Sequence, residues 1–250
     1  MASPSGGVQS LSRALDLLEV MADAGEPVAL SQLAADTGLP LATIHRLVRA
    51  LLDRGYVRQD ANRRYSLGPG LLRLGDAANR MVASWAVPQL RQLVREIGET
   101  ANLAMFDQDS VVYLAQVPSP HSMRMFTEVG RRVLPHCTGV GKALLAQIPD
   151  DRVGEIVART GMPAQTVNTL TSADALLAEL AAIRRRGFAV DDAEQEEGVR
   201  CVAVALSNGP TPLALSVSGP STRVTDVRMP AIAAALRRAA DDLVLQLETA

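Results

Sequence analysis

Residues 31–67 constrain the fold more strongly than any other stretch of this chain. They read SQLAADTGLPLATIHRLVRALLDRGYVRQDANRRYSL. The pattern predicts a short helix, a tight turn, a second helix with polar residues on one side, and then an arginine-rich hairpin. This order of elements is typical of a winged helix-turn-helix, in which the second helix enters the major groove of DNA.

Apolar spacing and cap residues set the expected boundaries of these helices. Ser10 is expected to cap a first helix that runs to about Ala24, and Ser31 to cap a short helix that runs to Thr37. A glycine turn follows, and the next helix begins at Pro40. Its predicted inward face consists of Ile44, Leu47, Val48, Leu51 and Leu52.

Charge is distributed unevenly along the chain. The formal net charge of all 250 residues is −2. Between Pro40 and Arg64, however, six arginines stand against two aspartates, which gives this segment a net charge of +4. From Trp85 to the last residue there are 16 basic and 19 acidic residues, a net charge of −3. Positive charge is therefore concentrated where contact with phosphates is expected.

The polar side of the second helix and the hairpin supply the candidate DNA contacts. Arginine pairs bidentately with guanine, and threonine hydroxyls bind phosphates or base edges. An amphipathic surface helix with solvated arginines is the alternative, but the order of helix, turn, helix and hairpin favours DNA binding. We expect groove contacts from Thr43, His45, Arg46 and Arg49. We expect contacts to the flanking phosphates from Arg58, Arg63 and Arg64.

The remaining sequence alternates between helical and extended patterns. A connecting helix is expected from Leu71 to about Ser84, followed by a helix that restarts at Pro88. Later helices are expected at residues 138–147, 150–159 and 172–186 and from about Thr222. Strands are expected at residues 102–107, 111–117, 188–191, 199–206 and 212–218. This alternation predicts an α/β (α+β) domain around a largely antiparallel sheet.

The pattern divides the chain into four expected parts. Residues 1–7 are expected to form a disordered tail, residues 8–68 the winged helix-turn-helix, residues 69–86 the linker helix, and residues 87–250 the second domain. The two cysteines are too few for a disulfide framework, and the sequence shows no signal segment and no apolar run of about 20 residues. We therefore expect a cytoplasmic protein that makes no membrane contact.

Several polar residues of the second domain are placed where they can converge on a small ligand. The segment Thr138–Gly141 opens a helix, so its backbone N–H groups can donate hydrogen bonds to a carboxylate or carbonyl oxygen. Asp191 ends one strand and Cys201 lies inside another. Ser216 and the serine two positions later share one face of a third strand, although they could form only its polar face. Such convergence is typical of a site for a small polar molecule.

Beyond these local patterns, the chain resembles the IclR family of bacterial transcription regulators over about residues 8–245. The resemblance rests on motifs that occur in the family's order: VQSLSRALDLLEVMA, LPLATIHRLVRALLDRGYV, YSLGPGLLRLG, GRRVLPHCTGVGKALLA, GFAVDDAEQEEGVRCVAVAL and LALSVSGPSTRVTD. It implies an N-terminal winged helix-turn-helix, a connecting helix and a C-terminal effector-binding domain similar to GAF and profilin-like sheets. It also implies homodimers through the N-terminal region, often paired into homotetramers.

The resemblance further implies which residues line an effector cavity. The positions that match the family pattern are Gly139, Val140, Asp191, Cys201, Ser216 and Ser218, with apolar walls near Met125, Val133 and Leu134. We expect the N–H groups of Gly139 and Val140 to hold a carboxylate or amide oxygen, while Asp191 and the serines bind hydroxyl, keto or N–H groups. The chain has only seven aromatic residues, which favours a short keto acid, hydroxy acid or ureide over a stacked aromatic ligand.

The expected function is that of a ligand-responsive transcription regulator that binds double-stranded operator DNA. The first hypothesis is a repressor of a catabolic operon that a small metabolite releases, and an activator of the same architecture is the second. The adjacent His136 and Cys137 leave open an enzyme or a metal-sensing site, but adjacent residues rarely face one another. A DNA-binding architectural protein without an effector is a further alternative. We expect no catalytic residue, no metal and no cofactor.

Overall fold

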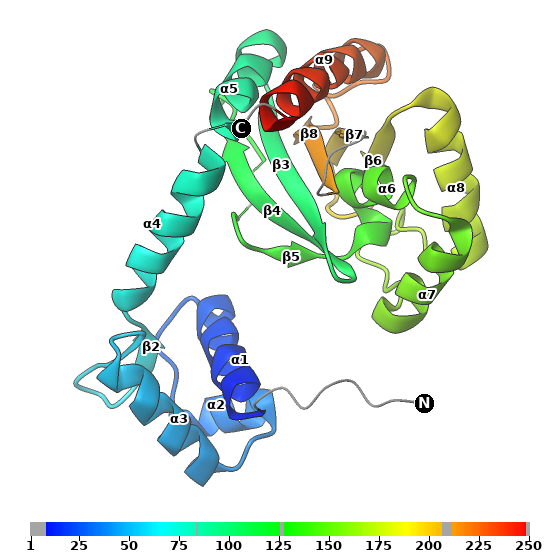
Figure 1. Ribbon diagram of the computed structural model, residues 1–250. Coiled ribbons are helices and arrows are strands. Elements are labelled where there is room, and N and C mark those ends of the chain that lie inside the picture. Colours follow the sequence, from blue (N-terminus) through cyan, green and yellow to red (C-terminus); the bar gives the residue numbers. More distant parts are fainter. Residues whose placement is uncertain (1–8, 84, 126–127, 207–211, 249–250) are drawn as a thin grey trace. The chain divides into compact units, whose positions relative to one another are not determined.

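The computed structural model describes residues 9–83, 85–125, 128–206 and 212–248. Contacts divide the chain into two compact units, and the division falls between Ala78 and Asn79. It lies within helix α4 (Gly70–Ala83), so the two units are described separately (Figure 1).

The first unit is a three-helix arrangement followed by a small hairpin (Figure 1). Its elements are α1 (Gln9–Ala24), α2 (Leu30–Thr37), α3 (Leu41–Asp53), β1 (Val57–Gln59) and β2 (Tyr65–Leu67). Two predicted caps are wrong, because Ser10 and Ser31 lie inside α1 and α2. At α2 the reason is a backbone bridge: Val28 exchanges hydrogen bonds of 2.7 and 2.8 Å with Tyr65, and the helix begins directly after it.

The core of the first unit forms on the predicted apolar face of α3. Ile44, Leu47, Val48 and Leu51 are buried, and Leu52 is half-buried. They pack with buried residues of the neighbouring elements, namely Leu17, Met21, Val28, Leu33, Val57 and Tyr65. Burial of this apolar face fixes the rotation of α3 about its axis, and its polar side is therefore left outside.

The hairpin has the predicted position, and its turn has a clear physical cause. Arg58 of β1 pairs with Ser66 of β2 in antiparallel register. In the turn, Asp60 Oδ1 accepts hydrogen bonds from the N–H groups of Asn62 at 2.9 Å and Arg64 at 2.8 Å. An aspartate that caps its own turn in this way is a common device. Between them, Arg63 adopts the left-handed conformation with φ of 58°.

The second unit is built on a six-stranded sheet in the order β5-β4-β3-β8-β7-β6, and all of its paired strands are antiparallel (Figure 1). The strands are β3 (Thr100–Asp107), β4 (Ser110–Val117), β5 (Arg132–Val133), β6 (Ala189–Asp192), β7 (Val199–Ala205) and β8 (Leu213–Pro220). The predicted mixed α/β class with a largely antiparallel sheet is confirmed.

Helices cover both faces of this sheet and create two separate cores. One core packs the sheet against α5 (Ala86–Ile97) and α9 (Met229–Glu248). The other packs it against α6 (Gly139–Leu145), α7 (Asp150–Thr160) and α8 (Ala173–Arg186). The side chains of alternate residues along each strand therefore enter different cores.

Some predicted boundaries in the second unit are wrong. Helix α5 begins at Ala86, before Pro88, because proline is tolerated in the first turn of a helix. Helix α9 begins at Met229 and not near Thr222, since the intervening residues form turns that start with the hydrogen bond from the N–H of Arg223 to Pro220 O. The two-residue strand β5 and the 3-10 turn at Pro135–Cys137 were not expected.

Candidate functional site

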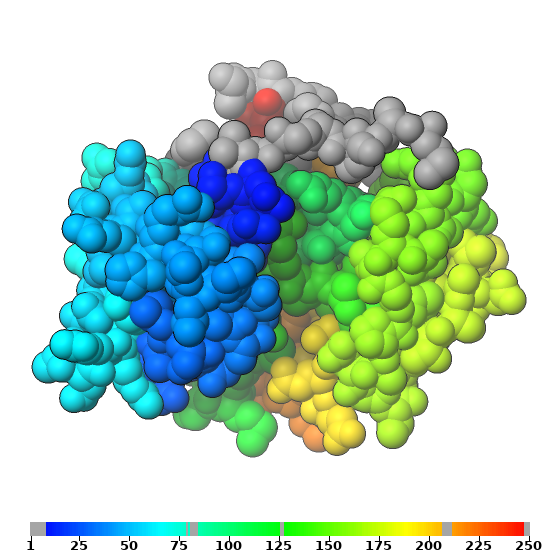
Figure 2. Space-filling view, turned by 90° about the horizontal axis from the view of Figure 1, so that it is seen from below, coloured from blue at the N-terminus to red at the C-terminus, as the bar shows by residue number. Residues whose placement is uncertain are grey.

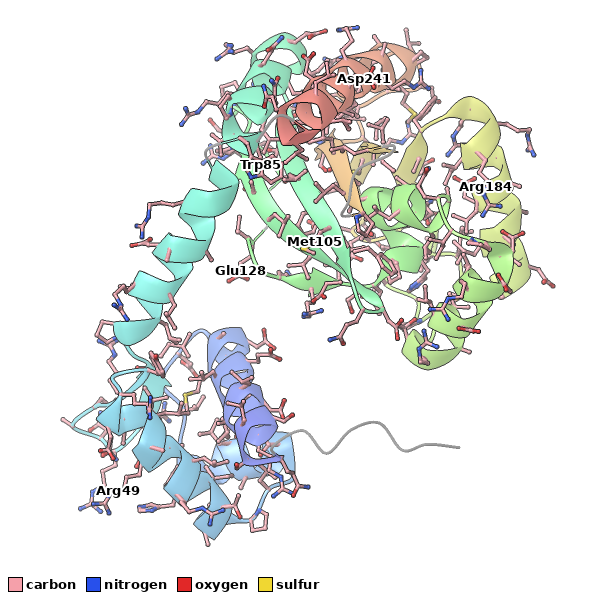
Figure 3. All side chains as sticks on the ribbon, viewed as in Figure 1. Arg49, Trp85, Met105, Glu128, Arg184 and Asp241 are labelled. Atoms are coloured by element: carbon pink, nitrogen blue, oxygen red, sulfur yellow. The ribbon has the colours of Figure 1, made fainter. Side chains whose placement is uncertain are left out.

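The outward side of α3 presents the side chains that the sequence predicts to enter a DNA groove. His45, Arg46 and Arg49 are exposed and Thr43 is half-exposed. Figure 3 shows Arg49 pointing away from the first unit, and Figure 2 shows the atoms of α3, in mid-blue, open at the surface in that view. No acidic residue occurs in α3 before its last position, Asp53.

The three arginines of the hairpin differ in how firmly they are held. Arg58 Nε donates a hydrogen bond of 2.9 Å to Ser66 Oγ, and Arg64 donates one of 3.2 Å to Pro27 O. Arg63 lies at the exposed tip, in the left-handed conformation. The hairpin thus combines two tethered guanidinium groups with one at its tip, an arrangement suited to phosphates on either side of a groove.

The second candidate site lies on the sheet face covered by α6. Residues directly opposite one another there form two polar rows across the strands. The first row places Gln116, Asn102 and Ser216 side by side on β4, β3 and β8. The second row places Thr100, Ser218, Cys201 and Asp191 side by side on β3, β8, β7 and β6. Four predicted effector residues, Asp191, Cys201, Ser216 and Ser218, therefore lie on one face.

The two serines share a partner that sequence reasoning did not select. The fully buried Asn102 donates from Nδ2 to Ser216 Oγ at 3.3 Å and to Ser218 Oγ at 3.4 Å. Gln116 Nε2 in turn donates to Asn102 Oδ1 at 3.1 Å. The serines are therefore part of a buried hydrogen-bond network and not a solvated strand face.

The start of α6 rests directly on this face. The Thr138 side chain caps the helix by accepting the N–H of Gly141 at 3.2 Å. A Cβ atom added to Gly139 would lie 2.8 Å from Cys201 Sγ, and one added to Gly141 would lie 2.3 Å from Pro135 O. Only glycines allow the backbone to approach this closely. Gly139 and Val140 are thereby brought against the polar rows, beside Cys201.

The acidic segment of residues 191–197 is divided between surface and interior, with Asp192, Glu196 and Glu197 exposed. Asp191 and Glu194 are buried, and Asp191 Oδ1 accepts the N–H of Glu194 at 2.7 Å and that of Gln195 at 3.4 Å. Lys142 of α6 is only 1% exposed and forms an ion pair with Glu194. Charges need such partners in a protein interior.

Burial shifts the pKa values of several groups around these rows. It raises the pKa of Asp191 to about 7, despite the two backbone N–H bonds that act in the opposite direction. Burial also raises the pKa of the Cys201 thiol to about 12, with the carboxylate of Asp191 contributing. Burial likewise raises the pKa of Tyr113, with contributions from Cys201 and Asp191. At neutral pH the thiol and the phenol are therefore uncharged.

The remaining predicted residues surround this centre less closely. Met125 is half-buried, and its carbonyl oxygen accepts a hydrogen bond of 3.0 Å from Thr100 Oγ1. Val133 and Leu134 are half-buried on the approach to α6. A cavity of about 260 Å³ in this unit lies elsewhere, between α6, α8, β7 and α9, and includes none of the predicted effector residues.

The adjacent histidine and cysteine do not face one another. His136 Nε2 lies 3.2 Å from Pro163 O, whereas Cys137 Sγ donates to Gln195 Oε1 at 3.0 Å. Burial lowers the pKa of His136 and raises that of Cys137 to about 12, so the thiolate needed for nucleophilic attack is disfavoured. Within the described residues, no three His, Cys, Asp or Glu side chains are grouped to hold a metal ion.

Comparison with known proteins identifies the family. The sequence-family model of the IclR helix-turn-helix domain matches residues 10–61. The family model of the bacterial transcriptional regulator IclR C-terminal domain matches residues 77–245. The chain belongs to the IclR family. IclR-family proteins are DNA-binding transcription regulators, so this chain is a regulator and not an enzyme.

Similar IclR proteins match nearly the whole chain. It is 37% identical to the transcriptional repressor IclR of Escherichia coli K12, over 98% of this chain and 92% of the relative. It is also 37% identical to the acetate operon repressor of Salmonella typhimurium LT2, over 96% of this chain and 90% of the relative. A solved IclR regulator from Alicyclobacillus acidocaldarius superimposes with a TM-score of 0.84 at 26% identity, covering 96% and 98% of the two chains.

Sequence reasoning missed four residues that this IclR chain places around the site. They are Asn102, Gln116, Lys142 and Glu194. A signal was present for three of them, since an isolated amide or lysine in an apolar strand or helix costs free energy unless it has a partner. Glu194 gave no such signal, because it stands in a run of acidic residues that is typical of an exposed loop.

Among the helices of the described residues, none has the length and apolar character that crossing a membrane requires.

Proposed function

We propose that this regulator represses a catabolic operon and that a small polar metabolite releases it from operator DNA. The observation that carries the proposal is the combination, in one chain, of an exposed basic helix α3 with a buried polar face of the predicted effector residues. Repression is supported by the relatives, which are named as repressors and in one case as the repressor of the acetate operon.

We propose that Thr43, His45, Arg46 and Arg49 contact the groove and that Arg58, Arg63 and Arg64 contact flanking phosphates. Arg46→Ala tests the groove assignment. We expect it to abolish specific operator binding in a gel-shift titration while leaving the melting temperature unchanged, because Arg46 is exposed and forms no part of the core. Arg152→Ala, which removes an exposed arginine of α7, is the charge-matched control. An unchanged operator affinity in Arg46→Ala would refute the assignment.

The predicted effector residues form the proposed sensing site. Effector must bind the DNA-free arrangement more tightly than the DNA-bound one, because only differential affinity can shift the equilibrium. Thermal-shift screening of short keto acids, hydroxy acids and ureides tests this, since a ligand at 100 times its dissociation constant stabilises a protein by about 2.7 kcal/mol. A stabilising compound must then lower operator affinity. If it raises operator affinity, the chain is an activator of the same architecture.

We further propose that residues 8–68 act as the DNA-reading domain, residues 69–86 as the linker and residues 87–250 as the effector-binding domain, in a homodimer or homotetramer. Dimeric helix-turn-helix proteins bind paired half-sites, so an operator with two-fold symmetry is expected. Light scattering of the purified protein distinguishes dimer from tetramer. A strictly monomeric chain bound to its operator would refute this part of the proposal.

A further inference from the structure

Four consecutive apolar residues stand at the start of the helix that is proposed to enter the DNA groove. They are Leu39, Pro40, Leu41 and Ala42, and the last two open α3. Leu39 is half-buried and packs against the core of the first unit. Leu41 is 55% exposed, and Pro40 and Ala42 are also exposed. Such an exposed apolar run is unfavourable in water unless a partner covers it.

The fold of the first unit does not require apolar side chains at positions 41 and 42. The apolar face with which α3 joins the core begins at Ile44, and neither Leu41 nor Ala42 belongs to that core. Backbone bonds fix the start of the helix, because the N–H groups of Thr43 and Ile44 donate to Pro40 O at 2.9 and 3.1 Å. These bonds do not involve the side chains of residues 41 and 42, so polar helix formers would fit there equally well.

The place of these two residues on α3 relates them to the proposed base contacts. Residues four apart are neighbours on the surface of a helix. Ala42 therefore lies one turn before Arg46, and Leu41 lies one turn before His45. All four side chains are exposed, and no charged residue occurs from position 38 to position 44. The basic surface of α3 thus begins with an uncharged apolar end, and recognition helices place their N-terminal residues against base edges.

The chemistry of the major groove offers one good partner for such an end. Among the four bases only thymine presents a methyl group there, and alanine and other apolar side chains contact it. The remaining groups along the groove are hydrogen-bond donors, acceptors and charged phosphates. The side chains of Leu41 and Ala42 can neither donate nor accept a hydrogen bond. Thymine methyl groups are therefore the groups that match them.

We propose that Leu41 and Ala42 are specificity-determining residues that contact thymine 5-methyl groups in the major groove, beside the base pairs contacted by Arg46. This inference rests on the proposed role of α3 in the groove. It adds a base preference that the basic residues do not supply. Each half-site of the operator is expected to contain a thymine whose methyl group contributes to affinity.

Duplexes that differ only in single methyl groups test the inference on the full-length protein. A random-sequence duplex library is first selected on the wild-type chain, and the recovered site is synthesised with each thymine in turn replaced by deoxyuridine. Deoxyuridine pairs with adenine as thymidine does and lacks only the 5-methyl group. In gel-shift titrations, wild-type affinity should fall about fourfold at one or more thymines of each half-site, the effect of losing one buried methyl group.

Variants at both positions separate an apolar contact from side-chain size. Leu41→Asn is similar in size but polar, so at the thymine that residue 41 contacts, the affinity ratio of the thymidine to the deoxyuridine duplex should approach one. Leu41→Met stays apolar and should keep the wild-type ratio. Ala42→Ser should lower the ratio at its own thymine. Val167→Ala, which trims a side chain that is 93% exposed in the second unit, is the control. A melting temperature close to that of wild type shows that each variant is folded.

Failure of this inference and failure of the proposed function have different signatures. If the wild-type chain selects a specific site in which no thymine methyl group affects affinity, the inference is wrong and specific DNA binding stands. The same holds if every methyl effect persists in both Leu41→Asn and Ala42→Ser. If Leu41→Asn changes the oligomeric state in light scattering and leaves the methyl effects intact, the exposed leucine serves a contact between copies of the chain and the inference is wrong. If selection recovers no specific sequence, the proposed function itself is wrong.

Discussion

The two units of this chain use charge in opposite ways. In the described part of the first unit no charged side chain is buried, and its core is entirely apolar apart from the tyrosine hydroxyl of Tyr65. The second unit buries Glu99, Lys142, Asp191 and Glu194 and pairs or caps each of them internally. Exposed positive charge in the first unit can bind the phosphates of DNA. Buried charges in the second unit order its interior through their partners.

The largest effect expected from this difference is at the buried ion pair. Lys142→Met removes the cation and leaves Glu194 buried without its partner, so unfolding free energy should fall by about 3–5 kcal/mol in urea denaturation. The double variant Lys142→Met with Glu194→Gln should recover much of the loss, because it leaves no uncompensated charge. If unfolding free energy fell by less than about 1 kcal/mol in the single variant, as for exposed ion pairs, the buried pair would contribute no more than surface charge does.

The second prediction concerns pH and Asp191. Its pKa rises from 3.8 to about 7 on folding, so between these values the folded chain holds a proton that the unfolded chain has released. Stability from this group therefore falls as pH rises through this window, and the cost is complete above pH 7. Asp191→Asn removes the cost while retaining an acceptor oxygen. Relative to wild type, the unfolding free energy of this variant should increase by up to about 4 kcal/mol between pH 4 and pH 8.

Urea denaturation at several pH values checks this expectation. The neighbouring Asp192→Asn is a matched control, because the Asp192 carboxylate is 56% exposed and pairs with Arg200 at the surface. Parallel pH profiles for wild type and Asp191→Asn would show that the buried carboxyl is not a source of pH dependence.

The smallest effect is expected at the surface of the first unit. Arg63→Ala should weaken binding to all DNA sequences alike and lower the salt slope of log affinity by about one unit, since one phosphate contact is lost. Its removal should leave unfolding free energy almost unchanged because Arg63 is exposed at the hairpin tip. Arg132→Ala, an exposed arginine of β5, is the control. A change confined to one operator sequence would mean that Arg63 reads bases.

The difference between the two units also determines how much of the structure the sequence predicts. The apolar repeat of α3 predicts its buried face, because a surface helix must turn that face inward, and its polar side follows directly. Lys142 stands in a seven-residue helix that is buried throughout, so its burial could be suspected, but its partner lies 52 residues away. Likewise, Asn102 and Ser216 are 114 residues apart, and only strand register brings them together. Long-range pairing of this kind leaves no local pattern.

The contact of Gly139 with Cys201 has a consequence for anyone who would re-engineer the protein. A single added carbon at position 139 would lie 2.8 Å from the sulfur, so the Cys201 thiol or the start of α6 would have to shift. This wall of the proposed site is thus among the tightest places in which to add a side chain. A library aimed at new sensor specificity should keep Gly139 fixed and vary the half-buried rim at Met125, Val133 and Leu134, where the packing leaves room for change.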